Sequence, residues 1–151
     1  MATDGDTIDP EGSVPGTQPG EYVRGELGEL RPGIERSHEF EVNDRLLTDV
    51  GGTIGVRFLS TPGMIAMLER NAAILSFEQL PEGKATVGFE VCVKHVAAAA
   101  EGAQCTAHAR LREVVDGRKL RFDVEVKEGE RTIGVGTHER RVIDVGAVKS
   151  A

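Results

Sequence analysis

Apolar and polar residues follow three different patterns along the chain. Residues 35–42 alternate between polar and apolar, which predicts a first β-strand. Residues 44–55 form a short connection that contains the pair Gly51-Gly52. In the next segment apolar residues cover most of a helical circumference, as they do in a buried helix. After Pro81 the period falls to two, which predicts a run of strands.

The predicted helix has a signal at each end. Thr61 and Pro62 predict its start, because a threonine hydroxyl at the N-cap accepts a hydrogen bond from an otherwise unpaired amide. A proline at the first helical position has no N–H to leave unpaired. Leu80-Pro81 predicts the stop. The helix should therefore span about 16 residues, or roughly 24 Å.

Four long strands are predicted after the helix, with turns at Asp116-Gly117 and Glu128-Gly129. Each strand is polar on one face, so the sheet should be antiparallel with one solvated side. With the first strand, this predicts an α+β fold in which a five-stranded antiparallel sheet wraps one long central helix. The open edges of such a sheet can pair with a second copy, so a homodimer is expected. In the first of these four strands, the alternation places one set of residues on the face toward the helix: Val87, Phe89, Val91, Val93 and His95.

The chain divides into one domain and two tails. Residues 1–33 hold four of the six prolines together with many glycines and acidic residues, so they are predicted to be a disordered tail. Residues 34–147 form the predicted domain, and residues 148–151 a short C-terminal tail.

Composition excludes several classes of function. The net charge of −7 argues against nucleic-acid binding, which needs clustered Lys and Arg. No apolar run approaches the roughly 18 residues that span a membrane. The two cysteines lie in predicted strands and no leader precedes the domain, so a cytoplasmic protein without disulfides is expected. The histidines and cysteines lack the spacing of a zinc site, so neither a metal nor a cofactor is expected.

Glu69 stands out on the predicted helix because Ile65 and Ala73, four residues away on either side, are apolar. Carboxylates are rarely buried unless they are paired, and burial raises the pKa of a glutamate toward the range useful for acid–base work. The alternative interpretation is that Glu69 and Arg70 mark the solvent-facing edge of the helix, with Arg57 or Arg70 as a surface partner.

Thr61 and His95 each allow two interpretations. His95 continues an apolar strand face toward the helix, either as a hydrogen-bonded core residue or as a functional group. Thr61 is sufficiently explained as an N-cap, yet a helix N-terminus also offers amides and a dipole that can stabilise an oxyanion.

Three segments occur together in one arrangement: FLSTPGMIAMLERNA, VGFEVCVKHVAAAAEG and GVGTHERRVI. Thr61 precedes Glu69 by eight residues, Glu69 precedes His95 by 26, and Gly88 precedes His95 by seven. In register over residues 31–145, this arrangement resembles the fluoroacetyl-CoA thioesterase group of hotdog-fold acyl-CoA thioesterases.

The resemblance implies a hotdog dimer that hydrolyses a small acyl-CoA thioester to a carboxylate and free CoA. It implies that Thr61, Glu69 and His95 form the catalytic set, that Gly88 lines the acyl pocket and that Arg140 lies near the substrate. Glu69 would activate Thr61 or a water, or attack the thioester itself, while His95 would act as general base or protonate the thiolate. The sequence does not choose between these routes.

One departure bears on the substrate. The fluoroacetate-specific member of the family carries a longer aromatic segment between the first strand and the helix, which covers the pocket. Here residues 43–60 are short and Phe58 is their only aromatic residue. We therefore expect a broader or different small acyl-CoA.

Two other functions remain open on the same fold. A hydratase acting on enoyl thioesters would need an Asp and a His five residues apart, and no histidine here follows an aspartate at that spacing. A non-catalytic module that binds acyl-CoA or another small ligand is the second alternative, since a fold does not determine its function.

Overall fold

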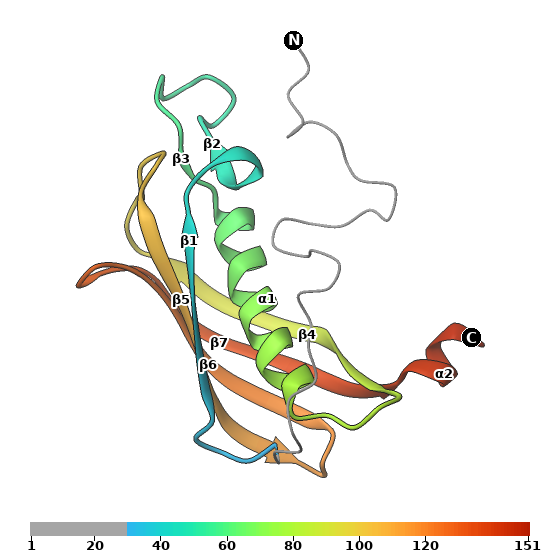
Figure 1. Ribbon diagram of the computed structural model, residues 1–151. Coiled ribbons are helices and arrows are strands. Elements are labelled where there is room, and N and C mark those ends of the chain that lie inside the picture. Colours follow the sequence, from blue (N-terminus) through green and yellow to red (C-terminus); the bar gives the residue numbers. More distant parts are fainter. Residues whose placement is uncertain (1–29) are drawn as a thin grey trace.

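A five-stranded antiparallel sheet curves around one long helix in the computed structural model, which describes residues 30–151 (Figure 1). The strand order is β1-β5-β6-β7-β4, so β1 and β4 are the two edges. This architecture confirms the predicted one. The strands are β1 Glu35–Glu41, β4 Lys84–His95, β5 Gln104–Val115, β6 Lys119–Glu128 and β7 Arg131–Asp144.

Helix α1, Thr61–Glu78, lies on the concave side of the sheet (Figure 1). Its 18 residues agree with the predicted length, but the predicted N-cap is wrong by one residue. Ser60 is the cap, and its hydroxyl accepts a hydrogen bond from the Gly63 amide at 2.9 Å. Thr61 is already helical, so its own hydroxyl is available for another contact.

The core fills the space between α1 and the inner face of the sheet. Burial of these side chains removes apolar surface from water, which is the main driving force for this packing. The largest fully buried side chains of the core include Met64 and Leu68 from the helix and Leu111, Leu120 and Phe122 from the strands.

The connection between β1 and α1 contains structure that the sequence did not predict. A 3-10 turn, η2 Asp44–Leu46, is followed by the short strands β2 Leu47–Thr48 and β3 Phe58–Leu59, which pair with each other. Phe58 also forms an isolated bridge to Ala100. This two-stranded ribbon fixes where the chain enters α1.

A β-bulge in β4 changes which residues face the helix. The pairing of β4 with β7 shifts register between Gly88 and Glu90. An extra residue in a strand reverses the alternation beyond it. Val87 is therefore 45% exposed and Phe89 60% exposed, so the prediction that these two face the helix is wrong. His95, beyond the bulge, does reach the helix.

The predicted tail over residues 1–33 falls mostly outside the described residues. Within the described residues, Leu30 and Ile34 pack partly against the core. A short helix, α2 Val145–Lys149, follows β7.

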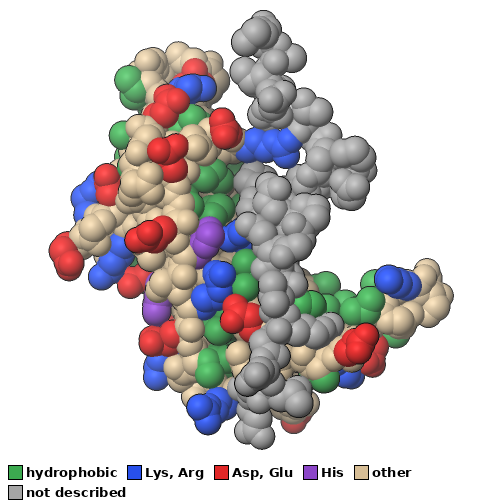
Figure 2. All heavy atoms as spheres, in the orientation of Figure 1, with side chains coloured by type: hydrophobic (Ala, Val, Ile, Leu, Met, Phe, Trp, Pro, Cys, Tyr) green, Lys and Arg blue, Asp and Glu red, His purple; other side chains and the backbone are tan. Residues whose placement is uncertain are grey.

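No helix in the described part of the chain is long and apolar enough to cross a membrane. On the face drawn in Figure 2, acidic and basic side chains are interspersed over the described surface.

Candidate active site

Thr61 and His95 meet at the N-terminal end of α1. Thr61 Oγ1 lies 2.9 Å from His95 Nδ1, within hydrogen-bond distance. The helix supplies Thr61 as its first residue, and β4 supplies His95 as its last. Because Ser60 caps the helix, the hydroxyl of Thr61 is not used in capping.

The environment of His95 favours the neutral imidazole. Burial lowers the pKa of His95, and the backbone of Ala97 opposes this shift. Its Nε2 atom is buried and has no hydrogen-bond partner among residues 30–151. A buried nitrogen without a partner is costly, so this atom favours contact with a further polar group.

The start of α1 offers few amides for an oxyanion. Pro62 has no N–H, the Gly63 amide donates to Ser60 Oγ, and the Met64 amide donates to Ser60 O at 2.9 Å. Of the first four helical residues, only Thr61 retains an N–H for a ligand. An oxyanion hole at this helix terminus would therefore rest on one backbone donor.

Glu69 lies eight positions after Thr61 on α1, and its side chain faces Arg140 of β7. Its Oε2 is 3.7 Å from Arg140 Nη1, and its side chain is 40% exposed. Glu69 is thus neither fully buried nor on a purely solvent-facing edge. Arg70 beside it is buried and donates to His38 Nε2 at 2.9 Å, while Arg57 pairs with Glu101.

Gly88 faces the carboxylate of Glu69. A Cβ atom added at Gly88 would lie 2.5 Å from Glu69 Oε2, 3.6 Å from Arg140 Nη1 and 3.7 Å from His138 Cε1. The first distance is too short for real atoms, so the absence of a side chain here makes room for the carboxylate. This is a structural reason for the glycine.

Arg140 is anchored by several groups. Its Nε donates to Thr86 Oγ1 at 2.8 Å and its Nη2 to Thr86 O at 3.1 Å. Its Nη1 approaches His138 Nε2 at 3.2 Å. Arg140 is only 6% exposed. The sequence analysis missed His138, although its position two residues before Arg140 in β7 places both on the same face of that strand.

The five candidate residues form two groups in one chain. Thr61 and His95 are together, and Glu69, Gly88 and Arg140 are together. Thr61 and Glu69 are eight positions apart on the helix, which corresponds to about 12 Å. Gly88 and His95 are seven positions apart on the strand, which corresponds to roughly 23 Å. The two groups are therefore too far apart to act on one thioester carbonyl within a single chain.

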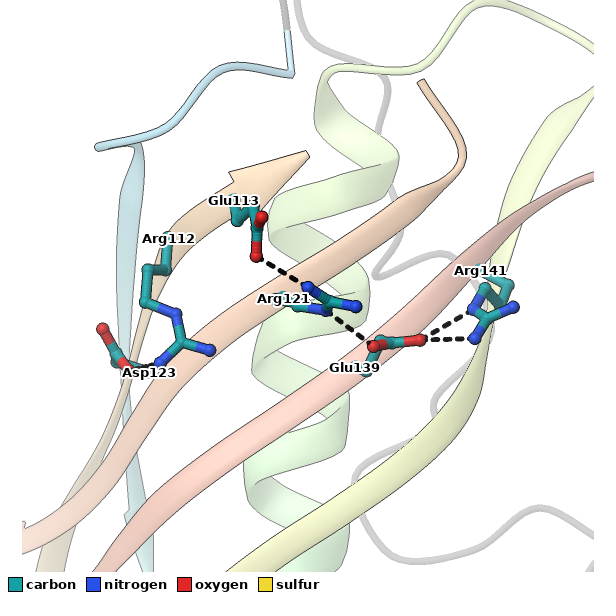
Figure 3. Close-up of polar contacts among 6 residues, drawn as sticks. All are labelled: Arg112, Glu113, Arg121, Asp123, Glu139 and Arg141. Carbon is teal, nitrogen blue, oxygen red and sulfur yellow. Dashed lines mark hydrogen bonds and ion pairs between the residues drawn. The ribbon is translucent and has the colours of Figure 1, made fainter. Parts of the chain in front are cut away.

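The outer face of the sheet carries a separate network of charged side chains (Figure 3). Arg121 donates to Glu139 and to Glu113, each at 2.9 Å, and Arg141 donates to Glu139 at 2.8 Å. These bonds lower the pKa of Glu139 and raise that of Arg121. A hollow on this face is lined by Phe89, Glu90, Arg112, Arg121, Thr137, His138 and Glu139.

This hollow does not contain the candidate catalytic residues. Its arginines face carboxylates at short distance, so their charges are balanced locally (Figure 3). Within residues 30–151, no cluster of three or more His, Cys, Asp or Glu side chains is placed to hold a metal ion.

Comparison with known proteins agrees with the geometry. A family model described as fluoroacetyl-CoA-specific thioesterase matches residues 42–146. A fluoroacetyl-CoA thioesterase from Streptantibioticus cattleyicolor is 37% identical over 84 residues, which are 56% of this chain and 60% of that protein. The match thus spans less than two thirds of the relative's length.

Solved structures share the fold. A crystal structure of a mutant fluoroacetyl-CoA-specific thioesterase in complex with fluoroacetate and CoA is 29% identical, covers 79% of this chain and 99% of its own, and has a TM-score of 0.71. A hot-dog-like protein from Thermanaerovibrio acidaminovorans is 20% identical, covers 79% and 87%, and has a TM-score of 0.70. The latter likeness concerns the fold alone. The chain has the hotdog fold and belongs to the fluoroacetyl-CoA-specific thioesterase family.

Proposed function

We propose that this protein hydrolyses a small acyl-CoA thioester to the free carboxylate and CoA, with Thr61, Glu69 and His95 as its catalytic set. The observation that carries the proposal is the hydrogen bond between Thr61 Oγ1 and His95 Nδ1 at 2.9 Å. A hydroxyl bonded to an imidazole of lowered pKa is the arrangement of an activated nucleophile. Family membership supplies the substrate class.

In the proposed reaction, neutral His95 accepts the proton of Thr61 while Thr61 Oγ1 attacks the thioester carbonyl. The carbon–sulfur bond breaks, CoA leaves as the thiol after taking the proton from His95, and the acyl group remains on Thr61. A water, deprotonated by His95, then releases the carboxylate and restores the hydroxyl. In a second route Glu69 attacks the carbonyl directly, the carbon–sulfur bond breaks and CoA leaves as the thiolate. Water hydrolyses the resulting anhydride, which releases the carboxylate product, restores the Glu69 carboxylate and supplies the proton that the thiolate takes up.

We further propose that the working unit is a homodimer paired through β4. This strand is a sheet edge, so its outward backbone groups can pair with a second copy. In an antiparallel pair around a two-fold axis, residues equally far from the axis lie opposite each other. With Cys92 on the axis, Val91 faces the partner's Val93, and the bulge before Glu90 brings Gly88 opposite the partner's His95.

Such a dimer would unite the two halves of the site. Gly88 and His95 both face α1, and directly opposite residues of paired strands share a face. The Thr61–His95 pair of one subunit would then lie beside Glu69 of the other. When Thr61 donates to Nδ1, the proton of His95 is on Nε2, which is the buried atom without a described partner. The Glu69 carboxylate of the other subunit would be an acceptor for this proton, beside the backbone of Ala97.

We propose a small acyl group that lies between Gly88 and the two catalytic groups. Arg140, fixed within 3.7 Å of Glu69, supplies a positive charge near the reacting carbonyl. The connection before α1 contributes only Phe58 as an aromatic residue, and its backbone is held by strand pairing with Thr48 and Ala100. This supports a preference that is broader than fluoroacetyl-CoA.

A cytoplasmic location is part of the proposal. Cys92 and Cys105 are both free thiols, and burial raises the pKa of Cys105 to about 11. Unpaired thiols fit a reducing compartment.

A panel of acyl-CoA substrates with a thiol-detecting reagent tests this function. The wild type should release CoA, whereas Glu69→Gln and His95→Ala should lose most turnover. His108→Ala serves as the control, because His108 bonds Ser37 on the solvent side of β5. Full turnover in both site variants would refute the catalytic set. Binding of acyl-CoA without any turnover by the wild type would establish a binding module instead.

A further inference from the structure

We propose that His138 is the positioning residue that holds Arg140 against Glu69, and that it does so only as the neutral imidazole. This inference rests on the thioesterase function proposed above and assigns a further residue to that site. His138 lies on β7, is 2% exposed and belongs neither to the predicted catalytic set nor to the outer network of Figure 3.

The contacts of the ring determine its tautomer. His138 Nδ1 is 2.8 Å from the carbonyl oxygen of Glu90, which can only accept, so Nδ1 carries a proton. His138 Nε2 is 3.2 Å from Arg140 Nη1, which can only donate, so Nε2 carries a lone pair. Both bonds exist together only when the ring is neutral and protonated on Nδ1.

The same contacts fix the direction of the Arg140 side chain. Thr86 accepts two hydrogen bonds from the far side of the guanidinium, and His138 accepts one from Nη1. Nη1 is also the atom that lies 3.7 Å from Glu69 Oε2. The His138 ring is itself held by stacking on Phe122, with centroids 6.2 Å apart. A rigid chain of contacts therefore runs from the core to the carboxylate.

The surroundings of His138 shift its pKa in opposite directions. Burial contributes most to lowering its pKa; the Glu90 carbonyl of β4 raises it, Arg140 of β7 lowers it, and Glu69 of α1 raises it. Phe122 of β6 carries no charge. Protonation of Nε2 would place an N–H donor against Arg140 Nη1 and add a second positive charge beside it. Acidification would thus remove the hydrogen bond that His138 accepts from Arg140 Nη1, the atom that faces Glu69, while the two bonds to Thr86 remain.

Two variants separate positioning from packing. In His138→Gln, the side-chain oxygen reaches the place of Nε2, so the acceptor for Arg140 is retained and the titration is removed. In His138→Asn, the amide reaches only the place of Nδ1, so the contact with Glu90 is retained and the acceptor for Arg140 is lost. Both variants remove the imidazole ring and its stacking on Phe122, and the two replacements differ by only one methylene, so loss of packing alone should affect them similarly.

We expect His138→Asn to lower kcat by about 10- to 100-fold with a smaller change in KM, which is the size of loss seen when groups that orient metal ligands are removed. His138→Gln should retain most of kcat, and the acid limb of its pH profile should be shallower than that of the wild type. Equal losses in the two variants, with an unchanged pH profile, would overturn the proposal. Thermal unfolding of each variant identifies losses that come from misfolding.

Nitrogen NMR of the wild-type histidines provides a readout that needs no activity. His138 should be neutral at pH 7 with its proton on Nδ1, and it should remain so below the ordinary histidine pKa of about 6.5. A proton on Nε2, or a charged ring at pH 7, would overturn the proposal even if the enzyme is active. A protein without turnover on any acyl-CoA would instead refute the proposed function. The NMR result would then still decide whether His138 has the proposed tautomer.

Discussion

Thr61 and His95 are 34 positions apart in the chain, yet Thr61 Oγ1 and His95 Nδ1 lie 2.9 Å from each other. The contact depends on Ser60, which caps α1 and leaves the Thr61 hydroxyl for the imidazole. Two adjacent hydroxyl residues thus have different tasks, one in folding and one in the proposed chemistry.

This division of tasks predicts opposite effects for two neighbouring variants. Thr61→Val keeps the shape and removes the hydroxyl, so it should lower kcat by about 100-fold or more with little change in the free energy of unfolding. Ser60→Ala removes the cap and should destabilise the protein by about 1 kcal/mol. Turnover assays and urea unfolding measure both. A Thr61→Val protein as unstable as Ser60→Ala would contradict the assignment of the cap.

Gly88→Ala should disturb the site more than the fold. Its new Cβ would lie 2.5 Å from Glu69 Oε2, and the carboxylate can swing away because it is the end of a flexible side chain. We expect a roughly tenfold loss of kcat, which is about 1.4 kcal/mol of transition-state stabilisation, and an unfolding free energy within about 1 kcal/mol of the wild type.

Gly136→Ala is the matched control for that variant. A Cβ at Gly136 would collide with the backbone of Cys92 and Val93, which cannot move without separating β4 from β7. It should therefore cost about 1–3 kcal/mol of stability. If Gly88→Ala unfolds as easily as Gly136→Ala, the space at Gly88 serves the fold rather than the carboxylate.

The proposed dimer predicts a specific covalent crosslink. With Cys92 on the two-fold axis, the two Cys92 residues are directly opposite, and their Cα atoms would be about 4.5–5.5 Å apart, which allows a disulfide. Mild oxidation with diamide should give a covalent dimer on a non-reducing gel. Cys92 is exposed and Cys105 is buried, so Cys92→Ser should abolish the crosslink and Cys105→Ser should not.

Sedimentation without oxidant completes this test. A dimer that resists crosslinking would place the two-fold axis elsewhere, and a monomer with full turnover would refute the composite site.

Stability should fall as the pH drops below the ordinary histidine pKa. The pKa values of His95 and His138 are both lowered in the folded protein, so the unfolded chain binds more protons between those values and about 6.5. Their contribution to the free energy of unfolding is complete above about pH 6.5. It is lost as the pH falls toward the pKa values that the two histidines have in the folded protein. The pKa of Glu139 is lowered by Arg121 and Arg141. Its contribution to stability is therefore lost only at lower pH, below the usual range of a glutamate pKa.

Urea unfolding from pH 8 down to pH 5 measures this dependence. His138→Gln should reduce the slope between the two ends of the range. The same slope in His138→Gln and in the wild type would show that His138 does not titrate in this window.

The site was only partly predictable from the sequence. Spacing and resemblance named Thr61, Glu69, His95, Gly88 and Arg140, and the structure places each of these residues on α1, β4 or β7. They could not predict that these residues fall into two groups, because separation along a strand and along a helix depends on how the two elements cross. His138 was missed because its role follows from a carbonyl and a guanidinium that only packing brings together.

The sequence by itself determined the long helix, the five strands of the sheet and the fold class, because period and turns depend on residues close together in the chain. Asp116 and Gly117, both with positive φ, form the turn that their residue types predict. Only the tertiary structure decided which hydroxyl caps α1, where β4 bulges and which tautomer His138 adopts. The bulge and the tautomer depend on contacts between distant segments, and such contacts leave no periodic trace in the sequence. The cap bond itself is local, but both Ser60 and Thr61 are residue types that can form it, and where the chain enters α1 selects Ser60.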